Sequence, residues 1–173
     1  HPLLAKMFED GDDVSPLHAS SAHSALLWAL ETCSWSQHHF GQVVELLARL
    51  DEIDPGGNLG NRPYGSLLSI FRPWFPQSSV PAERRLDVLD TMRERHSGVA
   101  WKMMQALLLE RHGFAMHMSA PRYRDWKPAE IAPRRAEYWA FVGELFTRVL
   151  EDAGTDRDRL VPLIDGLPNL PPQ

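Results

Sequence analysis

The chain has 173 residues, of which 43% are hydrophobic and 24% charged, as in a folded globular protein and unlike a disordered one. The formal net charge of -5 gives no general attraction to nucleic acid or to an anionic membrane surface. No apolar run approaches the roughly 20 residues that span a bilayer, and the single cysteine, Cys33, excludes an internal disulfide and an all-cysteine zinc site.

Helical spacing of apolar residues recurs along the whole chain. In chain order it predicts helices over 22–33, 36–53, 66–72, 81–95, 98–112, 133–153 and 155–166. The side chains expected to face the core are Leu26, Leu27 and Leu30; Phe40, Val43, Val44, Leu47 and Leu50; Leu67, Ile70 and Phe71; Leu86, Leu89 and Met92; Val99, Met103, Ala106, Leu107 and Leu108; Tyr138, Trp139, Val142, Leu145, Phe146, Val149 and Leu150; and Leu160, Val161 and Ile164.

Proline and glycine agree with these boundaries. Pro81 and Pro133 suit the first turn of a helix, where no partner exists for the N–H that proline lacks. Gly113 and Gly154 follow two of the predicted helices, where a left-handed residue often ends a helix. Thr155 or Asp156 is expected to cap the last helix.

The fold class predicted from this periodicity is all-α. No segment alternates strictly between apolar and polar residues, so we expect no sheet. We expect a single domain over 1–173 with about six to eight stacked helices, irregular or HEAT/TPR-like, although no clean repeat near about 34 or 40 residues is present. The chain starts without Met and stops within an apolar pattern, which indicates a segment cut from a larger protein.

The loop over 54–65 contains Asn61-Arg62-Pro63 between two predicted helices. We interpret it as a structural turn: Asn61 bonds local backbone, and Pro63 fixes φ ahead of the next helix. Arg62 should be buried and bonded to backbone carbonyls or to a carboxylate such as Glu31, Asp51 or Asp54. Another loop, 73–80, carries Trp74, which would be buried only if the loop packs against the helices.

Metal and cofactor chemistry find little support. The histidines lack ligand spacing, and the adjacent His38 and His39 should diverge on a helix. Cys33 continues an apolar stripe, so we expect it to be buried as a small hydrophobic residue. We therefore predict no metal site, no cofactor and no catalytic residue.

The strongest binding candidate is a basic and aromatic segment around Tyr123. Its members are Arg122, Arg124, Trp126, Lys127, Arg134 and Arg135. Arg134 and Arg135 lie in the first turn of a predicted helix, where the helix dipole disfavours cations. An anionic partner is therefore expected, and we favour intramolecular carboxylates that brace the loop. The alternatives are a small enzyme or a nucleic-acid-binding module that uses the 113–135 loop.

Three stretches together resemble a known kind of protein. They are Leu26-Leu27-Trp28-Ala29-Leu30-Glu31 with the 43–50 helix and Asp54-Pro55-Gly56-Gly57; Asn61-Arg62-Pro63 through Ser66-Leu67 and Ile70-Phe71-Arg72-Pro73-Trp74 to Pro76-Gln77; and Arg124-Asp125-Trp126 with Glu137-Tyr138. The pattern resembles the helical region of very large bacterial proteins that carry a nucleotide-binding or Sir2-like module elsewhere, including STAND-type and Sir2-type antiphage defence proteins.

No Walker lysine and no Sir2-like nucleotide motif is present in this sequence, so those activities do not transfer to any of its residues. The resemblance implies a scaffold or sensor role. We therefore expect a non-catalytic, cytoplasmic scaffold or protein-recognition segment. Its partners would be other proteins or other domains of its parent chain, not membranes or nucleic acid.

Overall fold

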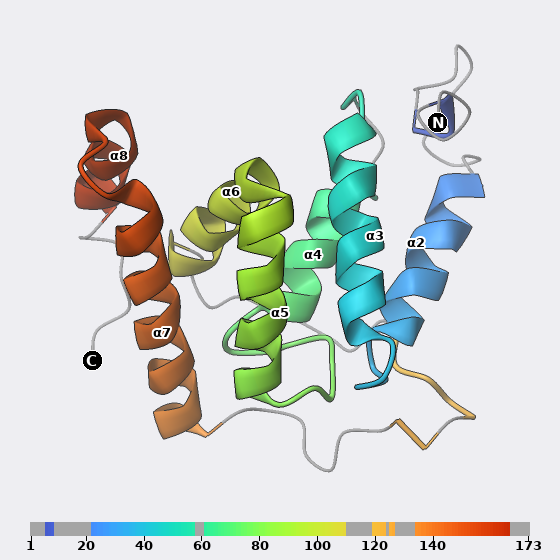
Figure 1. The fold of residues 1–173 in the computed structure, drawn as a ribbon. Helices are drawn as coiled ribbons and strands as arrows, with labels where there is room; N and C mark the ends of the chain where they lie inside the picture. The colour runs from blue at the N-terminus through green and yellow to red at the C-terminus, as the bar shows by residue number, and fades with distance from the viewer. Residues whose placement is uncertain are drawn as a thin grey trace.

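The computed structural model describes residues 6–8, 22–57, 61–109, 119–123, 125–126 and 134–166, and it is all-α there, without a strand (Figure 1). The helices with assigned bounds are α2 (Ala22–Cys33), α3 (Phe40–Ile53), α4 (Pro63–Phe71), α5 (Ala82–Arg95), α6 (Ser97–Leu109), α7 (Arg135–Ala153) and α8 (Arg157–Gly166). The predicted all-α fold class is confirmed.

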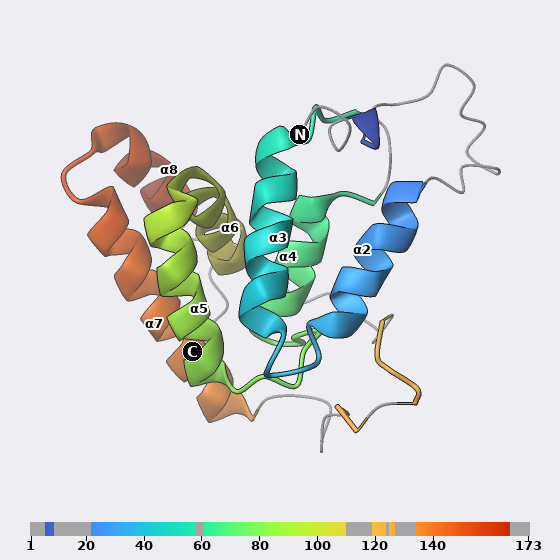
Figure 2. The same ribbon diagram turned by 45° about the vertical axis from the view of Figure 1, so that its right-hand side comes forward.

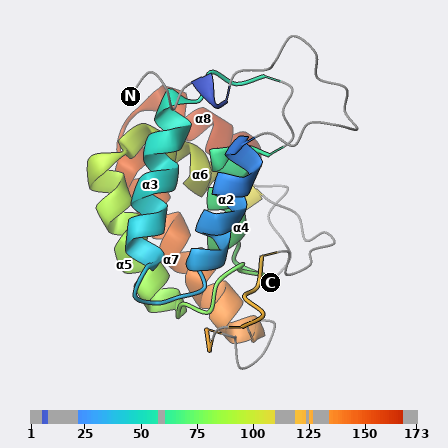
Figure 3. The same cartoon turned by 90° about the vertical axis from the view of Figure 1, so that its right-hand side faces the viewer.

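The helices pack as an array in which most chain neighbours are also spatial neighbours, whereas α4 and α5 each contact α3 and α6 more than one another. In Figure 1, α2, α3, α5 and α7 lie side by side, and α4 and α6 lie behind them. Figure 3 shows α3 and α5 on one side of the molecule and α2 and α4 on the other. Helix α6 contacts α3, α4, α5 and α7. It therefore joins the first helices of the array to the last ones.

The core follows the predicted stripes in the middle of the chain. Every inward residue predicted for α3, α4 and α5 is buried, with Phe40, Leu47, Leu67, Ile70 and Leu89 fully covered. In α6, the buried residues are Val99, Ala100, Met103, Met104, Leu107 and Leu108, while the predicted Ala106 is only half-buried. Burial of this apolar area is the main favourable term for the fold.

Helix boundaries are set by local chemistry at several ends. Pro63 begins α4 at its first turn, three residues earlier than periodicity indicated. Pro81 precedes α5 as its N-cap residue. Gly154 ends α7 with φ +51°, a left-handed value that glycine adopts without strain. Asp156 Oδ1 accepts the Asp158 N–H at 2.9 Å, as expected of a cap for α8. Gly113 and Pro133 lie outside the described residues.

The predicted faces of the last two helices are partly wrong. In α7 the buried line is Phe141, Leu145, Val149 and Ala153, whereas Leu150 is 45% exposed. In α8 the buried residue is Leu163, while Val161 and Ile164 are 43% and 61% exposed. Helix α8 contacts mainly α7. Only one line of α8 side chains is therefore covered.

Smaller expectations at the α2–α3 connection are also corrected. Cys33 is half-buried against the core and not fully buried. His38 and His39 lie in a turn before α3, and their rings meet edge to face with centroids 4.9 Å apart instead of diverging. No helix among the described residues is long and apolar enough to cross a bilayer.

Candidate functional site

The segment over 119–126 lies beside the lower end of α2 in Figures 1 and 2. Its first residue, Ser119, donates its hydroxyl to Glu31 Oε2 at 2.7 Å. The other oxygen of the same carboxylate, Oε1, accepts the Ser66 hydroxyl of α4 at 2.6 Å. Pro121 is buried. Glu31 thus fastens the start of this segment to α2 and α4.

The other end of the segment is held by aromatic packing. Trp126 is half-buried, and its ring meets the His39 ring edge to face with centroids 5.9 Å apart. His39 is the N-cap residue of α3. The segment is therefore attached at both of its described ends to the α2–α4 part of the array.

Between these attachments, the predicted binding residue Arg122 and its neighbour Tyr123 face solvent. Arg122 is exposed, and Tyr123 is 94% exposed. Asp125 is also exposed, so a carboxylate accompanies the arginine on this stretch. Arg124 and Lys127 lie outside the described residues. We name the exposed pair, Arg122 and Tyr123, the 122–123 tip.

The remaining basic residues are placed at the start of α7. Arg134 is the N-cap residue of α7, and its backbone N–H donates to Glu137 Oε2 at 3.1 Å. Glu137 also brings a negative charge to the helix N-terminus, which the dipole favours. Arg134 and Arg135 are exposed. Within the described residues, neither they nor Arg122 forms an ion pair with another side chain. The internal bracing expected of them stays a prediction, because residues 127–133 lie outside the described part of the chain.

The turn before α4 has the bracing role predicted for it. Arg62 is only 14% exposed, and its Nη1 donates to Asp54 Oδ1 at 2.7 Å and to the Phe8 carbonyl at 2.8 Å. Asp54 Oδ1 also accepts the Gly56 N–H at 3.1 Å. Pro63 is buried at the start of α4, and the Asn61 side chain is half-buried. The prediction that Arg62 is buried and bonded to backbone and carboxylate is confirmed.

The loop after α4, residues 73–80, packs against the helices, as expected if Trp74 is to be buried. Trp74 is half-buried, with the Arg72 guanidinium 5.4 Å from its ring centroid. The Gln77 N–H donates to the Ser69 carbonyl at 2.9 Å, and the Ser78 hydroxyl donates to the Ser34 carbonyl at 2.7 Å. These bonds hold the loop to α4 and to the α2–α3 connection.

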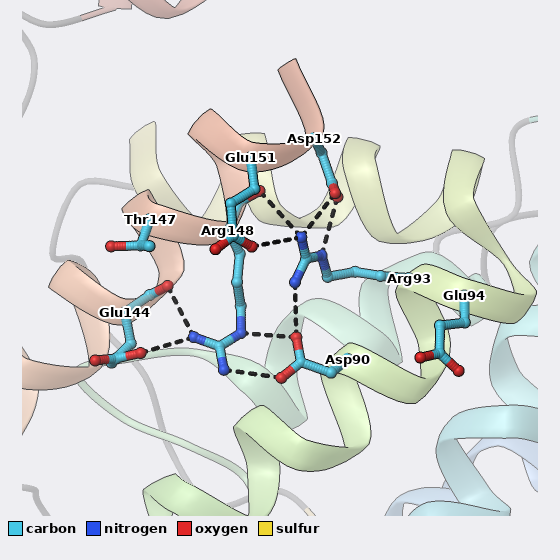
Figure 4. A pocket seen from close by; sticks show the side chains of 8 residues that line it. All are labelled: Asp90, Arg93, Glu94, Glu144, Thr147, Arg148, Glu151 and Asp152. Atoms are coloured by element: carbon cyan, nitrogen blue, oxygen red, sulfur yellow. Dashed lines mark hydrogen bonds and ion pairs between the residues drawn. The ribbon is translucent and has the colours of Figure 1, made fainter. Parts of the chain in front are cut away.

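A polar cleft between α5 and α7 was not foreseen from the sequence (Figure 4). It has a volume of about 530 Å³ and is lined by Asp90, Arg93, Glu94, Glu144, Thr147, Arg148, Glu151 and Asp152. The only hint in the sequence is charge at spacings of three and four, such as Asp90 with Arg93 and Glu144 with Arg148. Such spacing is usual on a solvated helix face.

The two arginines of the cleft cross-link the helices. Arg148 of α7 binds both oxygens of Asp90 in α5, each at 2.8 Å. Arg93 of α5 binds both oxygens of Asp152 in α7 at 2.7 and 3.0 Å, and also donates to Asp90 at 2.8 Å. Figure 4 shows the guanidinium groups turned toward these carboxylates. Paired forks of this kind are the strongest protein ion pairs.

The ion pairs also shift the pKa values of charged side chains in the cleft. Burial by itself raises the pKa of Asp90, but hydrogen bonds from Arg148 and Arg93 outweigh it and hold that pKa below its usual value. The hydrogen bond to Asp152 raises the pKa of Arg93, and the bond to Asp90 raises that of Arg148. A carboxylate fixed in its ionised form is a poor general acid, so Asp90 serves to join α5 to α7.

Metal-ligating residues do not gather in the described part of the chain, where no group of three His, Cys, Asp or Glu side chains has the arrangement of a metal site. His112 and His117 lie outside that part.

The chain was compared with known proteins at three levels. No family model, no curated protein and no solved structure matches it.

Proposed function

We propose that the chain is a non-catalytic helical scaffold and protein-recognition segment of a larger bacterial protein, in the manner of the helical regions of STAND-type or Sir2-type defence proteins. Its binding element is the 122–123 tip. Its partner is a second protein or another domain of the parent chain, in the cytoplasm.

The observation that supports this proposal is the way the 119–126 segment is mounted. Glu31 and His39 hold its two ends on helices, while Tyr123 between them is 94% exposed. Tyrosine and arginine are enriched where proteins bind one another, because both offer a large contact area and hydrogen bonds. A side chain of this kind on a fixed support loses little conformational freedom on binding.

The polar side chains elsewhere favour a scaffold over an enzyme. Arg62 joins Asp54 to Phe8, and Arg93 and Arg148 join α5 to α7. In each case the charged group connects separate parts of the array and its hydrogen-bonding capacity is used internally. Such groups contribute to the rigidity of the array.

The test is site-specific photocross-linking in the full-length parent protein expressed in its native host. A photoreactive phenylalanine analogue replaces Tyr123 in one variant and Thr91, an exposed residue of α5, in the control. The proposal expects a discrete cross-linked product from position 123 that position 91 does not give. Mass spectrometry of that product identifies the partner protein or domain.

A second variant pair separates recognition from folding. Arg122→Ser with Tyr123→Ser should keep the helical circular dichroism spectrum and abolish binding to the partner so identified. If position 123 gives no more product than position 91, or if the double variant binds normally, the proposed recognition role is wrong.

A further inference from the structure

Helix α7 carries a line of exposed residues on the side that faces away from the core. The line consists of Ala136, Ala140, Gly143, Thr147 and Leu150, all of which are exposed. Their spacing alternates between four and three residues, as at the positions through which one helix packs along another. In Figures 1 and 2, α7 lies at one edge of the array, with α5 and α6 on its inner side. Among the described helices, none covers this line.

The exposed line leaves room for a close approach by another helix. Alanine, glycine and threonine have short side chains, and a Cβ added at Gly143 would meet no side chain and no other element of the described chain within 4 Å. Leu150 is 45% exposed, and Trp139 and Phe146 beside the line are half-buried. Covering these three side chains would remove apolar area from water, which is the main driving force for protein association.

Three glutamates at seven-residue spacing, Glu137, Glu144 and Glu151, run along one side of the line, and all three are exposed. Each is held through one carboxylate oxygen. Glu137 Oε2 accepts the N–H of the α7 N-cap residue. Glu144 Oε2 accepts a hydrogen bond from Arg148 at 2.8 Å, and Glu151 Oε2 accepts one from Arg93 at 3.0 Å (Figure 4). Among the described residues, the second oxygen of each glutamate has no hydrogen-bond donor, so it is available to a partner.

The polar cleft beside the line adds negative charge to this side of α7. Glu144 and Glu151 line the cleft, and Thr147 belongs both to the cleft and to the exposed line. Five carboxylates and two arginines line the cleft, which leaves a surplus of three negative charges. A lysine or arginine can lay its aliphatic stem on apolar surface while its charged head lies among carboxylates. We name the exposed line together with Glu137, Glu144 and Glu151 the α7 outer face.

We propose that the α7 outer face binds a basic amphipathic α-helix of a second protein or of another domain of the parent chain, with lysine or arginine at seven-residue spacing beside its apolar positions. In a pair of packed helices, the charged residues that flank the apolar line face those of the partner, and opposite charges there select the partner. A second copy of α7 lacks the complementary charge, because it presents glutamates or the rings of Trp139 and Phe146 at those positions. The α7 outer face is separate from the 122–123 tip, and this proposal does not depend on the tip.

The test measures binding of fluorescent synthetic peptides to the 173-residue chain by fluorescence anisotropy. The first peptide is a helix of about three heptads with leucine and alanine at the apolar positions and arginine at the flanking ones. The second has the same composition in scrambled order, and the third has glutamate in place of arginine. The ordered basic peptide should bind at least about tenfold more tightly than the scrambled one, and the acidic peptide should not bind. Equal affinities of the ordered and scrambled basic peptides would overturn the proposal, because charge alone would then explain the binding.

Two variants locate the peptide on α7. Ala140→Arg places a long cationic side chain in the middle of the exposed line, so it should keep the helical circular dichroism spectrum and abolish binding of the ordered basic peptide. Glu144→Gln with Glu151→Gln should weaken binding by about three- to tenfold, as expected for the loss of two exposed ion pairs. Wild-type affinity in both variants would mean that the peptide does not bind this face.

Two controls exclude other binding sites. Glu83→Gln with Asp87→Asn removes the same charge from exposed positions of α5 and should leave the affinity for the ordered basic peptide unchanged. An equal loss of affinity in this control would overturn the proposal. Arg122→Ser with Tyr123→Ser should bind the peptide like wild type, even if the recognition role of the tip is wrong. Loss of binding in that variant would place the peptide on the 122–123 tip and not on α7.

Discussion

The Glu31 carboxylate and the Ser119 hydroxyl, 88 positions apart in the chain, meet at 2.7 Å. The same carboxylate accepts the Ser66 hydroxyl, so one side chain of α2 joins α4 and the segment that carries the 122–123 tip. A charged acceptor with two donors is worth more than a neutral one.

Glu31→Ala should therefore lower the free energy of unfolding by about 1–3 kcal/mol, because the buried Ser66 hydroxyl and the half-buried Ser119 hydroxyl lose their acceptor. Ser119→Ala should cost less, about 0.5–1.5 kcal/mol, and should make the 119–126 segment more sensitive to limited proteolysis. Urea denaturation measures the first effect. Glu83→Ala, at an exposed position in the first turn of α5, is the control. It should lower the free energy of unfolding by no more than the roughly 0.3–1 kcal/mol of a helix-dipole interaction and leave proteolysis of the segment unchanged.

Arg62→Ala should destabilise the chain by about 1–3 kcal/mol, because Asp54 and the Phe8 carbonyl lose their shared donor. A single atom, Nη1, makes both bonds, so Arg62→Lys should recover part of the loss. Arg84→Ala provides the comparison, since Arg84 is 59% exposed and lies 3.7 Å from Asp87. Equal melting temperatures for the Arg62 and Arg84 alanine variants would contradict the bracing role.

Arg85 should tolerate an apolar replacement. It is 3% exposed, it bonds the Phe71 carbonyl at 3.3 Å, and its guanidinium lies 4.5 Å from the Phe141 ring centroid. Among the described residues no carboxylate pairs with it, and burial lowers its pKa to about 10. Arg85→Met fills similar space without a buried charge and should stay within about 1 kcal/mol of wild type or exceed it.

Arg85→Ala should instead cost about 2–4 kcal/mol through the cavity it leaves. Chemical denaturation gives the free energy of unfolding of both variants. Comparing the two values separates the contribution of side-chain packing from that of the guanidinium charge. A methionine variant as unstable as the alanine variant would mean that the guanidinium bonds dominate.

Acid unfolding should depend on Asp90. Its pKa in the folded chain lies below the usual value, so the stability it contributes is present above the pKa of an unfolded aspartate and is lost as pH falls through the folded value. Wild type should therefore lose more stability than Asp90→Asn between about pH 5 and about pH 2. Asp87→Asn, at a position 67% exposed, should behave like wild type in the same titration by circular dichroism.

The sequence alone was sufficient to predict the fold class and most of the core. Where a helix is covered along one broad face, as in α3 and α5, the apolar stripe and the buried stripe coincide. Periodicity was insufficient for α8, where Leu160, Val161, Leu163 and Ile164 form one broad apolar face. Tertiary contact decides that Leu163 is buried while Val161 and Ile164 are exposed.

Polar contacts were harder to predict than apolar ones. The partner of Arg62 could be named, because the turn places Asp54 only eight residues away. The partners of Arg93 and Arg148 could not, because Asp152 and Asp90 are 59 and 58 residues away and meet them only after α5 and α7 pack. His96 likewise meets the carboxylates of Glu52 and Glu45, which are 44 and 51 residues away.

The central position of α6 in the array affects how the chain folds during its synthesis. Helix α4 contacts α6 as well as α3 and α2, yet all of α5 leaves the ribosome before α6 does. During translation, α4 lacks this partner until α6 emerges, and its apolar residues are more open to chaperones that bind apolar segments. A polypeptide stopped after α5 would lack the helix that contacts α3, α4, α5 and α7, so α6 is the helix whose arrival links the two ends of the array.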